Sequence, residues 1–211
     1  MDRSTAVTRV QRDLGFKTTL STEIVDALKD SQSELEKDNF LPWFLQSEVT
    51  SAATVDGEER VALPTGFLRE WTDDGLWYYD GTAAVDERWT LLVKDDIEFL
   101  RGLYPGEGKP VAYALDPSYF RIFPTPDEAY TLKMIFYKAD TVLSSDVENK
   151  WLEHAHELMI GEAGMKIAGP VRDEPAMEIF QSMSNRGRAR LIKATEARME
   201  EQRRYVMGGE D

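Results

Sequence analysis

The spacing of apolar residues changes twice along this chain, and that change limits the folds it can adopt. Apolar residues first recur every three or four positions, as at Val7, Val10 and Leu14, which is the period of a helix. From about residue 43 they alternate, which is the period of a strand, and after residue 141 the helical spacing returns. "YTLKMIFYK" (130–138) is the clearest strand, with one face formed by Tyr130, Leu132, Met134 and Phe136.

This order of periods predicts an α+β fold rather than a regular alternation of strands and helices. We expect residues 1–42 and 141–205 to form a helical bundle. Residues 43–140 should form an antiparallel β-sheet or barrel-like region inserted into it, and residues 206–211 a flexible acidic tail.

Several residues predict where the early helices begin and end. Gly15 should end the first helix, because glycine readily takes the left-handed conformation that follows a last turn. Ser21 or Thr22 should cap the second helix, and Asn39 should end it. Residues 144–169 are predicted to form one further helix.

Small residues mark the later helices. The small residues of the helix that ends at Gly169 should let a neighbouring helix approach closely. Residues 173–206 are predicted to form a long last helix with an apolar seam, in which Gly187 is a weak point because glycine is a poor helix former. The small residues of the earlier helix are Gly161, Ala163, Gly164 and Ala168.

Turn signals predict how the strands pair. Asp56-Gly57 should join a hairpin, and residues 75–80 and 87–94 should form a second pair. A short helix capped by Asp95 or Asp96 should follow, and then a third pair across Asp116-Pro117. Residues 120–140 are interpreted as the closing hairpin of the β region.

The charge of the chain argues against nucleic-acid binding as its main task. With 39 acidic and 25 basic residues the net charge is -14, whereas affinity for DNA comes mostly from lysine and arginine on phosphates. The chain has no cysteine, no apolar stretch at its start and no apolar run of bilayer-spanning length. We therefore expect a soluble protein made in a cytoplasm, without disulfides or membrane contact.

The residues that carry chemistry are sparse. The only histidines, His154 and His156, point away from each other on a helix, and Glu153-x-x-His156 occurs once where di-iron bundles need two such pairs. "GLYPGEGKP" (102–110) lacks the spacing of a phosphate-binding loop. We predict no catalytic, cofactor-binding or metal-binding residue and no enzymatic activity, with a metal-dependent hydrolase using Glu153 and His156 as the less favoured alternative.

Basic residues gather on the predicted last helix. They allow three interpretations: local ion pairs with interleaved glutamates, contact with nucleic acid, or docking on an acidic surface of a partner or of another copy. The predicted protein–protein interface consists of Arg186, Arg188, Arg190, Lys193, Arg198, Arg203, Arg204 and Tyr205.

The order of these motifs resembles the head-to-tail adaptor (connector) proteins of tailed bacteriophages. A first helix ends in "DLG", and a second runs into the aromatic turn "LPWF" (41–44). "RVALPTGFLRE" (60–70) lies in the β region, and "FRIFPTPDEAYTLKMIFYKADTVLSSD" (120–146) is similar to the Pro-x-Pro hairpin of that family. A helix rich in alanine and glycine and a last helix rich in arginine and glutamate complete the pattern.

The resemblance implies a structural protein of the head–tail junction of the virion, without a cofactor. Such adaptors form a ring, commonly of twelve copies, beneath the portal protein. They extend the DNA channel, through which double-stranded DNA passes without specific binding, and they offer a platform for a tail or nozzle protein. A tail-tube gatekeeper, or another virion assembly factor of similar architecture, is the alternative.

Overall fold

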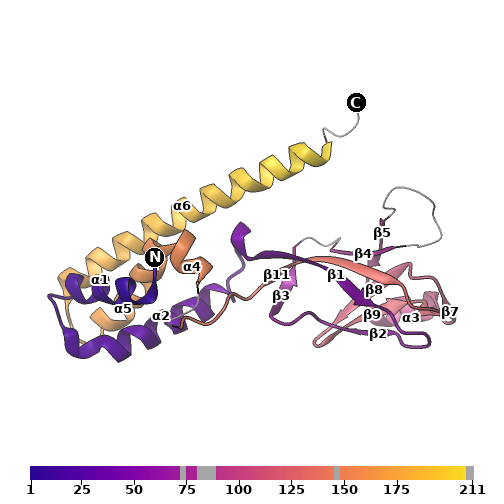
Figure 1. Ribbon diagram of the computed structural model, residues 1–211, viewed down its shortest axis with the longest axis horizontal. Helices are drawn as coiled ribbons and strands as arrows, with labels where there is room; N and C mark the ends of the chain where they lie inside the picture. The colour runs from indigo at the N-terminus through magenta and orange to yellow at the C-terminus, as the bar shows by residue number, and fades with distance from the viewer. Residues whose placement is uncertain (72–74, 80–88, 145–147, 208–211) are drawn as a thin grey trace. The chain divides into compact units, whose positions relative to one another are not determined.

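The computed structural model describes residues 1–71, 75–79, 89–144 and 148–207, and the chain divides into two compact units (Figure 1). The first unit comprises Met1–Leu45 and Ala139–Asp211, and the second comprises Gln46–Lys138. Helices at both ends of the chain flank a region of mostly antiparallel strands, so the predicted α+β class is confirmed. In the described part of the chain, no helix is both long and apolar enough to cross a bilayer.

The first unit is built around one central helix, α5 (His156–Ala168), which packs against α1, α2 and α6. Seven of its thirteen residues are buried, among them Leu158, Met159 and Ile160. The other elements of this unit are α1 (Arg3–Asp13), η1 (Thr18–Leu20), α2 (Ser21–Leu35), η2 (Trp43–Leu45), α4 (Lys150–His154) and α6 (Glu174–Met207).

The ends of α1 follow capping chemistry. Asp2 accepts a hydrogen bond from the backbone N–H of Thr5 at 2.7 Å. At the other end Gly15 has φ 71°, and the N–H of Phe16 reaches back to the carbonyl of Gln11, as in a Schellman motif. The prediction that Gly15 ends this helix is confirmed.

The predicted ends of α2 were wrong. Neither Ser21 nor Thr22 caps it, because the preceding η1 turn leads directly into the helix and the Ser21 hydroxyl instead bonds the carbonyl of Thr18. The helix ends at Leu35, four residues before Asn39.

The single helix predicted over residues 144–169 is also wrong, because α4 and α5 are separated at Ala155, whose φ is -133°. Side chains of α4 and its cap bond to α2 and to Glu36 just after it. Asn149 caps α4 by accepting from the N–H of Leu152, and its amide donates to Gln32 at 3.1 Å. The indole of Trp151 is buried and donates to Glu36 at 3.0 Å.

The strands of the second unit form two larger sheets and one short pair, with a short helix, α3 (Ile97–Leu103). The first sheet has the order β1-β11-β4-β5, and β3 also pairs with β11; its strands are β1 (Gln46–Ala53), β3 (Phe67–Glu70), β4 (Leu76–Tyr79), β5 (Trp89–Leu91) and β11 (Thr131–Lys138). The second sheet has the order β2-β9-β8-β6, from β2 (Arg60–Ala62), β9 (Tyr119–Phe123), β8 (Ala112–Asp116) and β6 (Val93–Lys94). The short parallel pair is β7 (Glu107–Gly108) and β10 (Thr125–Pro126).

The core of this unit draws on both larger sheets. Leu132, Met134 and Phe136 of β11 are buried in one apolar cluster with Phe120 and Ile122 of β9. The predicted apolar face of residues 130–136 is therefore confirmed. The described strands pair along open paths, so a barrel-like closure stays a prediction.

Two predicted strand pairs and one cap are confirmed. β4 pairs with β5, β8 pairs with β9, and Asp96 caps α3 by accepting from the N–H groups of Glu98 and Phe99.

Two predicted hairpins are wrong. β1 pairs with β11 and β2 with β9, so Asp56-Gly57 closes only the isolated bridge between Val55 and Glu58. Residues 120–140 form no hairpin, because β9 and β11 lie in different sheets. Pro124 and Pro126 lack the N–H that a ladder needs, and the chain crosses there from one sheet to the other.

Candidate interaction surface on the last helix

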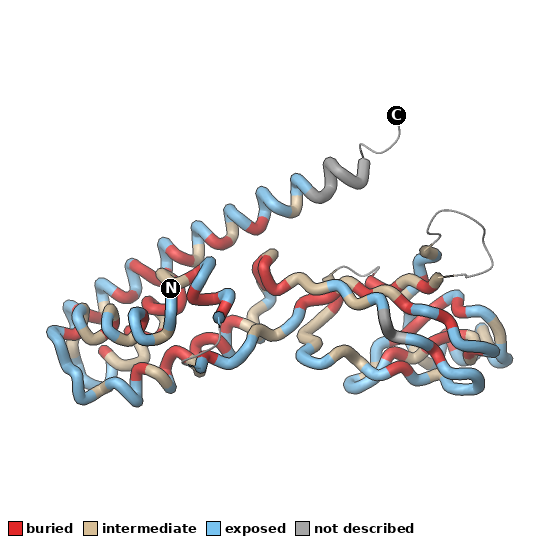
Figure 2. The backbone as a smooth tube through the Cα atoms, in the orientation of Figure 1, coloured by how far each residue is buried: buried red, intermediate tan, exposed pale blue. Residues whose placement is uncertain are grey.

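The position of α6 is set by one apolar face that packs on α5. Phe180, Met183, Ser184, Gly187, Leu191 and Thr195 are buried on this face. Buried and exposed positions alternate along the helix (Figure 2). In Figure 1 the C-terminal part of α6 runs past the other helices of its unit. The exposed side of α6 is therefore a long helical surface that the rest of its unit leaves open.

Three glycines bring α5 and α6 into close contact. A Cβ atom at Gly161 would lie 2.5 Å from the backbone nitrogen of Ser184, and one at Gly164 would lie 2.2 Å from the ring of Phe180. A Cβ atom at Gly187 would lie 2.5 Å from the backbone nitrogen of Leu158. The close approach expected for residues 161 and 164 is confirmed. Gly187, interpreted from sequence as a weak point, is instead a contact that fixes which side of α6 faces outward.

Three of the predicted interface residues, Arg188, Arg190 and Arg198, contact other elements of their own unit and hold α6 on it. Arg188 pairs with Asp38 at 2.7 Å and with Glu162 at 3.6 Å, and the guanidinium holds the pKa of the Asp38 carboxyl below its ordinary value. Arg190 pairs with Glu157 at 2.5 Å.

Arg198 anchors α6 farther along. Its guanidinium lies 4.9 Å from the ring centre of Trp43, and it also approaches Glu201 at 4.0 Å. Most of these partners come from other elements rather than from the interleaved glutamates of α6, so sequence spacing did not indicate them.

Two other predicted residues lie on the open side of α6. Arg186 and Lys193 are exposed, and the Arg186 guanidinium donates only to the backbone carbonyl of Ser182 among the hydrogen bonds of the described residues. Arg186 also lines a shallow hollow with Ile179, whose side chain is 48% exposed. The side chains of Arg203, Arg204 and Tyr205 lie outside the described residues.

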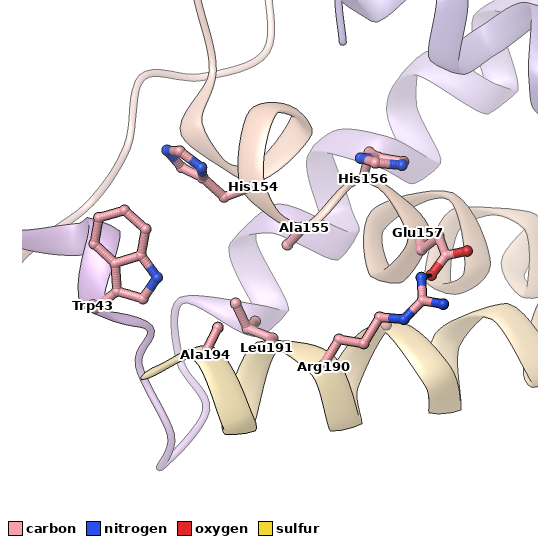
Figure 3. Close-up of a pocket in the computed structure, with 9 residues that line it drawn as sticks. Trp43, His154, Ala155, His156, Glu157, Arg190, Leu191 and Ala194 are labelled. Atoms are coloured by element: carbon pink, nitrogen blue, oxygen red, sulfur yellow. Dashed lines mark hydrogen bonds and ion pairs between the residues drawn. The ribbon is translucent and has the colours of Figure 1, made fainter. Parts of the chain in front are cut away.

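A groove of roughly 280 Å³ lies where the α4–α5 junction meets α6 (Figure 3). The rings of His154 and Trp43 lie 5.0 Å apart, centre to centre, with their planes tilted by 50°. His156 lies on the other side of Ala155. Burial lowers the pKa of His156, and the nearby Arg9 lowers it further. The groove is lined by Trp43, His154, Ala155, His156, Glu157, Gly187, Arg190, Leu191 and Ala194.

The groove offers apolar and aromatic contact rather than a set of metal ligands. In the ranges that the structure describes, no three acidic or histidine side chains lie close enough together to hold a metal ion. Glu153 lies 3.7 Å from the imidazole of His154 and is mostly exposed. Sequence reasoning missed the groove, because Trp43 is far from the histidines in sequence.

Comparison with known proteins matches the chain to one family. The model of the family described as SU10 adaptor protein covers residues 1–207, which includes both units. No curated protein matches the chain at a significant level.

Proposed function

The chain belongs to the SU10 adaptor protein family, and from this we propose that it forms a ring beneath the portal of a tailed bacteriophage. Membership alone makes it an adaptor protein of a bacteriophage, a structural component of the virion, and the family resemblance predicted from sequence is confirmed. The ring, its place under the portal and its role in the DNA channel are our proposal.

The observation that carries the proposal is the extent of the family match, which spans nearly the whole chain. The arrangement of the first unit supports it. Because α5 packs against both α2 and α6, those two helices are left with outward faces that a neighbouring copy can contact. A subunit with two different contact faces assembles head to tail, and such an assembly closes into a ring when the rotation between copies allows it.

The outward side of α6 is the proposed protein–protein interface. Arg186 and Lys193 are exposed on it, and we assign Arg203, Arg204 and Tyr205 to the same interface. Arg188, Arg190 and Arg198 act differently on this proposal, because their partners within the unit keep α6 in position.

The net charge of -14 supports a channel through which DNA passes without binding. A surface with few free cations does not displace counterions from phosphates, so it gives DNA little to adhere to. On this proposal the ring, of about twelve copies, contacts the portal protein on one side and a tail or nozzle protein on the other.

The test is to mix the full-length protein with the purified portal protein of the same phage and to view the particles by electron microscopy. We expect a second ring stacked on one face of the portal. Portal particles that stay bare, although both proteins are folded by circular dichroism, would overturn the proposal. A ring that binds purified tail tubes but not the portal would instead support the gatekeeper alternative.

A further inference from the structure

The outward face of α2 is acidic over most of its length. Glu23, Asp26, Asp30 and Glu34 are all exposed, and at 100° per residue they fall within one third of the helix circumference. The opposite face is buried against the unit, with Ile24, Ala27, Leu28 and Leu35 as its apolar residues.

Between Ser182 and Lys193, a length that matches the acidic face of α2, the charges on the outward face of α6 are basic. Arg186 and Lys193 are exposed seven residues apart, and Ser182 and Ala189 on the same side are small. The glutamates of this side, Glu178 and Glu196, lie outside that stretch. Small side chains let another helix come close, so that the long arginine and lysine side chains can reach its carboxylates.

The two faces lie on different sides of the first unit. Both α2 and α6 turn their buried faces toward α5, so their exposed faces point away from it. The two helices also run in the same direction. Lys17, before α2, lies 3.3 Å from Asp173, before α6, and Asp38, beyond the end of α2, pairs with Arg188.

The charged side chains at the centre of these two faces form no ion pair with other described residues of the chain. Of the ion pairs formed by described residues, none involves Glu23, Asp30, Arg186 or Lys193. By contrast Asp26 lies 3.5 Å from Lys29 and Glu34 lies 2.6 Å from Lys166.

We propose that the acidic face of α2 in one copy docks on the basic face of α6 in the next copy of the ring. Glu23 and Asp30 are seven residues apart, as are Arg186 and Lys193, so both pairs of charges are about 10.5 Å apart along their helices. A rotation of about 30° between neighbours in a ring of twelve keeps the two helices nearly parallel. Glu23 then meets Arg186 while Asp30 meets Lys193. This inference rests on the proposed ring and names its subunit contact.

The test uses two charge-reversed variants of the full-length chain. One carries R186E and K193E, which places glutamates on α6 opposite Glu23 and Asp30 of the next copy. The other carries E23K and D30K, which places lysines on α2 opposite Arg186 and Lys193 of the next copy. Each alone should place rings on roughly tenfold fewer portal particles than the wild type, because like charges then face each other at every subunit contact.

Mixing the two variants in equal amounts should restore the rings. In an alternating ring, the two new glutamates of α6 meet the two new lysines of α2 at every second contact, and at the other contacts Arg186 and Lys193 meet Glu23 and Asp30. This rescue cannot come from refolding, because neither chain is changed by mixing. A control with R12E and R172E reverses two exposed charges of the same unit away from both faces, and it should form rings as the wild type does.

The outcomes separate this inference from the proposed function. Wild-type rings on the portal, with both reversed variants also forming rings, would leave the proposed function standing and overturn the helix pairing. Loss of rings in both variants without rescue on mixing would also overturn it. A wild-type chain that forms no ring would overturn both proposals.

Discussion

Replacing Gly187 with alanine should destabilise the first unit, although alanine is the better helix former. In an open helix this change gains about 1 kcal/mol. Here the new Cβ would lie 2.5 Å from the backbone nitrogen of Leu158, whereas ordinary contact begins at 3.4 Å, so roughly 0.9 Å is missing. The obstructing atoms belong to the main chain, and no side-chain rotation relieves the overlap.

The helices must therefore move apart, and overpacking of this kind costs about 1–3 kcal/mol. We take the upper end, about 3 kcal/mol, because separating α5 from α6 also loosens the contact between Gly164 and Phe180. The net loss is then about 2 kcal/mol, which lowers the melting temperature by about 4–8 °C in a chain of this size.

Thermal unfolding followed by circular dichroism measures this effect, with Gly102→Ala as the matched control. Gly102 is also helical, in α3, but a Cβ there meets nothing within 4 Å. The control should be as stable as the wild type or gain up to about 1 kcal/mol. A Gly187→Ala protein that melts at or above the wild-type temperature would show that α5 and α6 have room to spare, and the reasoning would fail.

Three further predictions concern ionisable groups. Arg188→Met should lower the free energy of unfolding at pH 7 by about 1 kcal/mol or less, because its ion pair with Asp38 is partly exposed. Folding lowers the pKa of Asp38, so this loss should be present above about pH 4 and vanish as the pH falls through the folded pKa. Urea titrations at pH 7 and at a pH below the folded pKa measure it. His156→Gln should flatten the loss of stability as the pH falls from 7 to 5, because a lowered folded pKa makes protonation of His156 oppose folding, and an unchanged slope would contradict this. Lys94→Met should cost about 2 kcal/mol by leaving the buried Glu70 carboxylate without its cation, and adding Glu70→Gln should recover part of that loss in the same assay.

The positions of helices and strands were predicted from the sequence more accurately than the pairing between strands. Strand "YTLKMIFYK" and the Asp96 cap are local signals, because alternation and a capping carboxylate act over a few residues, and both are confirmed. The pairing of β1 with β11 is not local. β11 is buried in the core and Val49 of β1 packs against it, although the two strands are far apart in sequence. The nearby Asp56-Gly57 signal pointed to the wrong partner.

The groove on the first unit could not be predicted for the same reason. Trp43, His154 and Leu191 come from three separate elements, and only packing brings them together. The break at Ala155 is likewise not indicated by helix propensity, which does not include contacts from distant parts of the chain such as those of Asn149 with Gln32 and of Trp151 with Glu36.

The basic residues of α6 show what separates a structural charge from one available to a partner. Arg186, Arg188 and Arg190 alternate along a few residues, and composition treats them alike. The contact of Gly187 with Leu158 fixes the rotation of α6, and that rotation turns Arg188 toward Asp38 while it leaves Arg186 facing solvent. On our proposal the glycine contacts between α5 and α6 therefore determine which basic side chains of α6 face a neighbouring copy. A substitution at Gly187 should then disturb ring formation as well as stability.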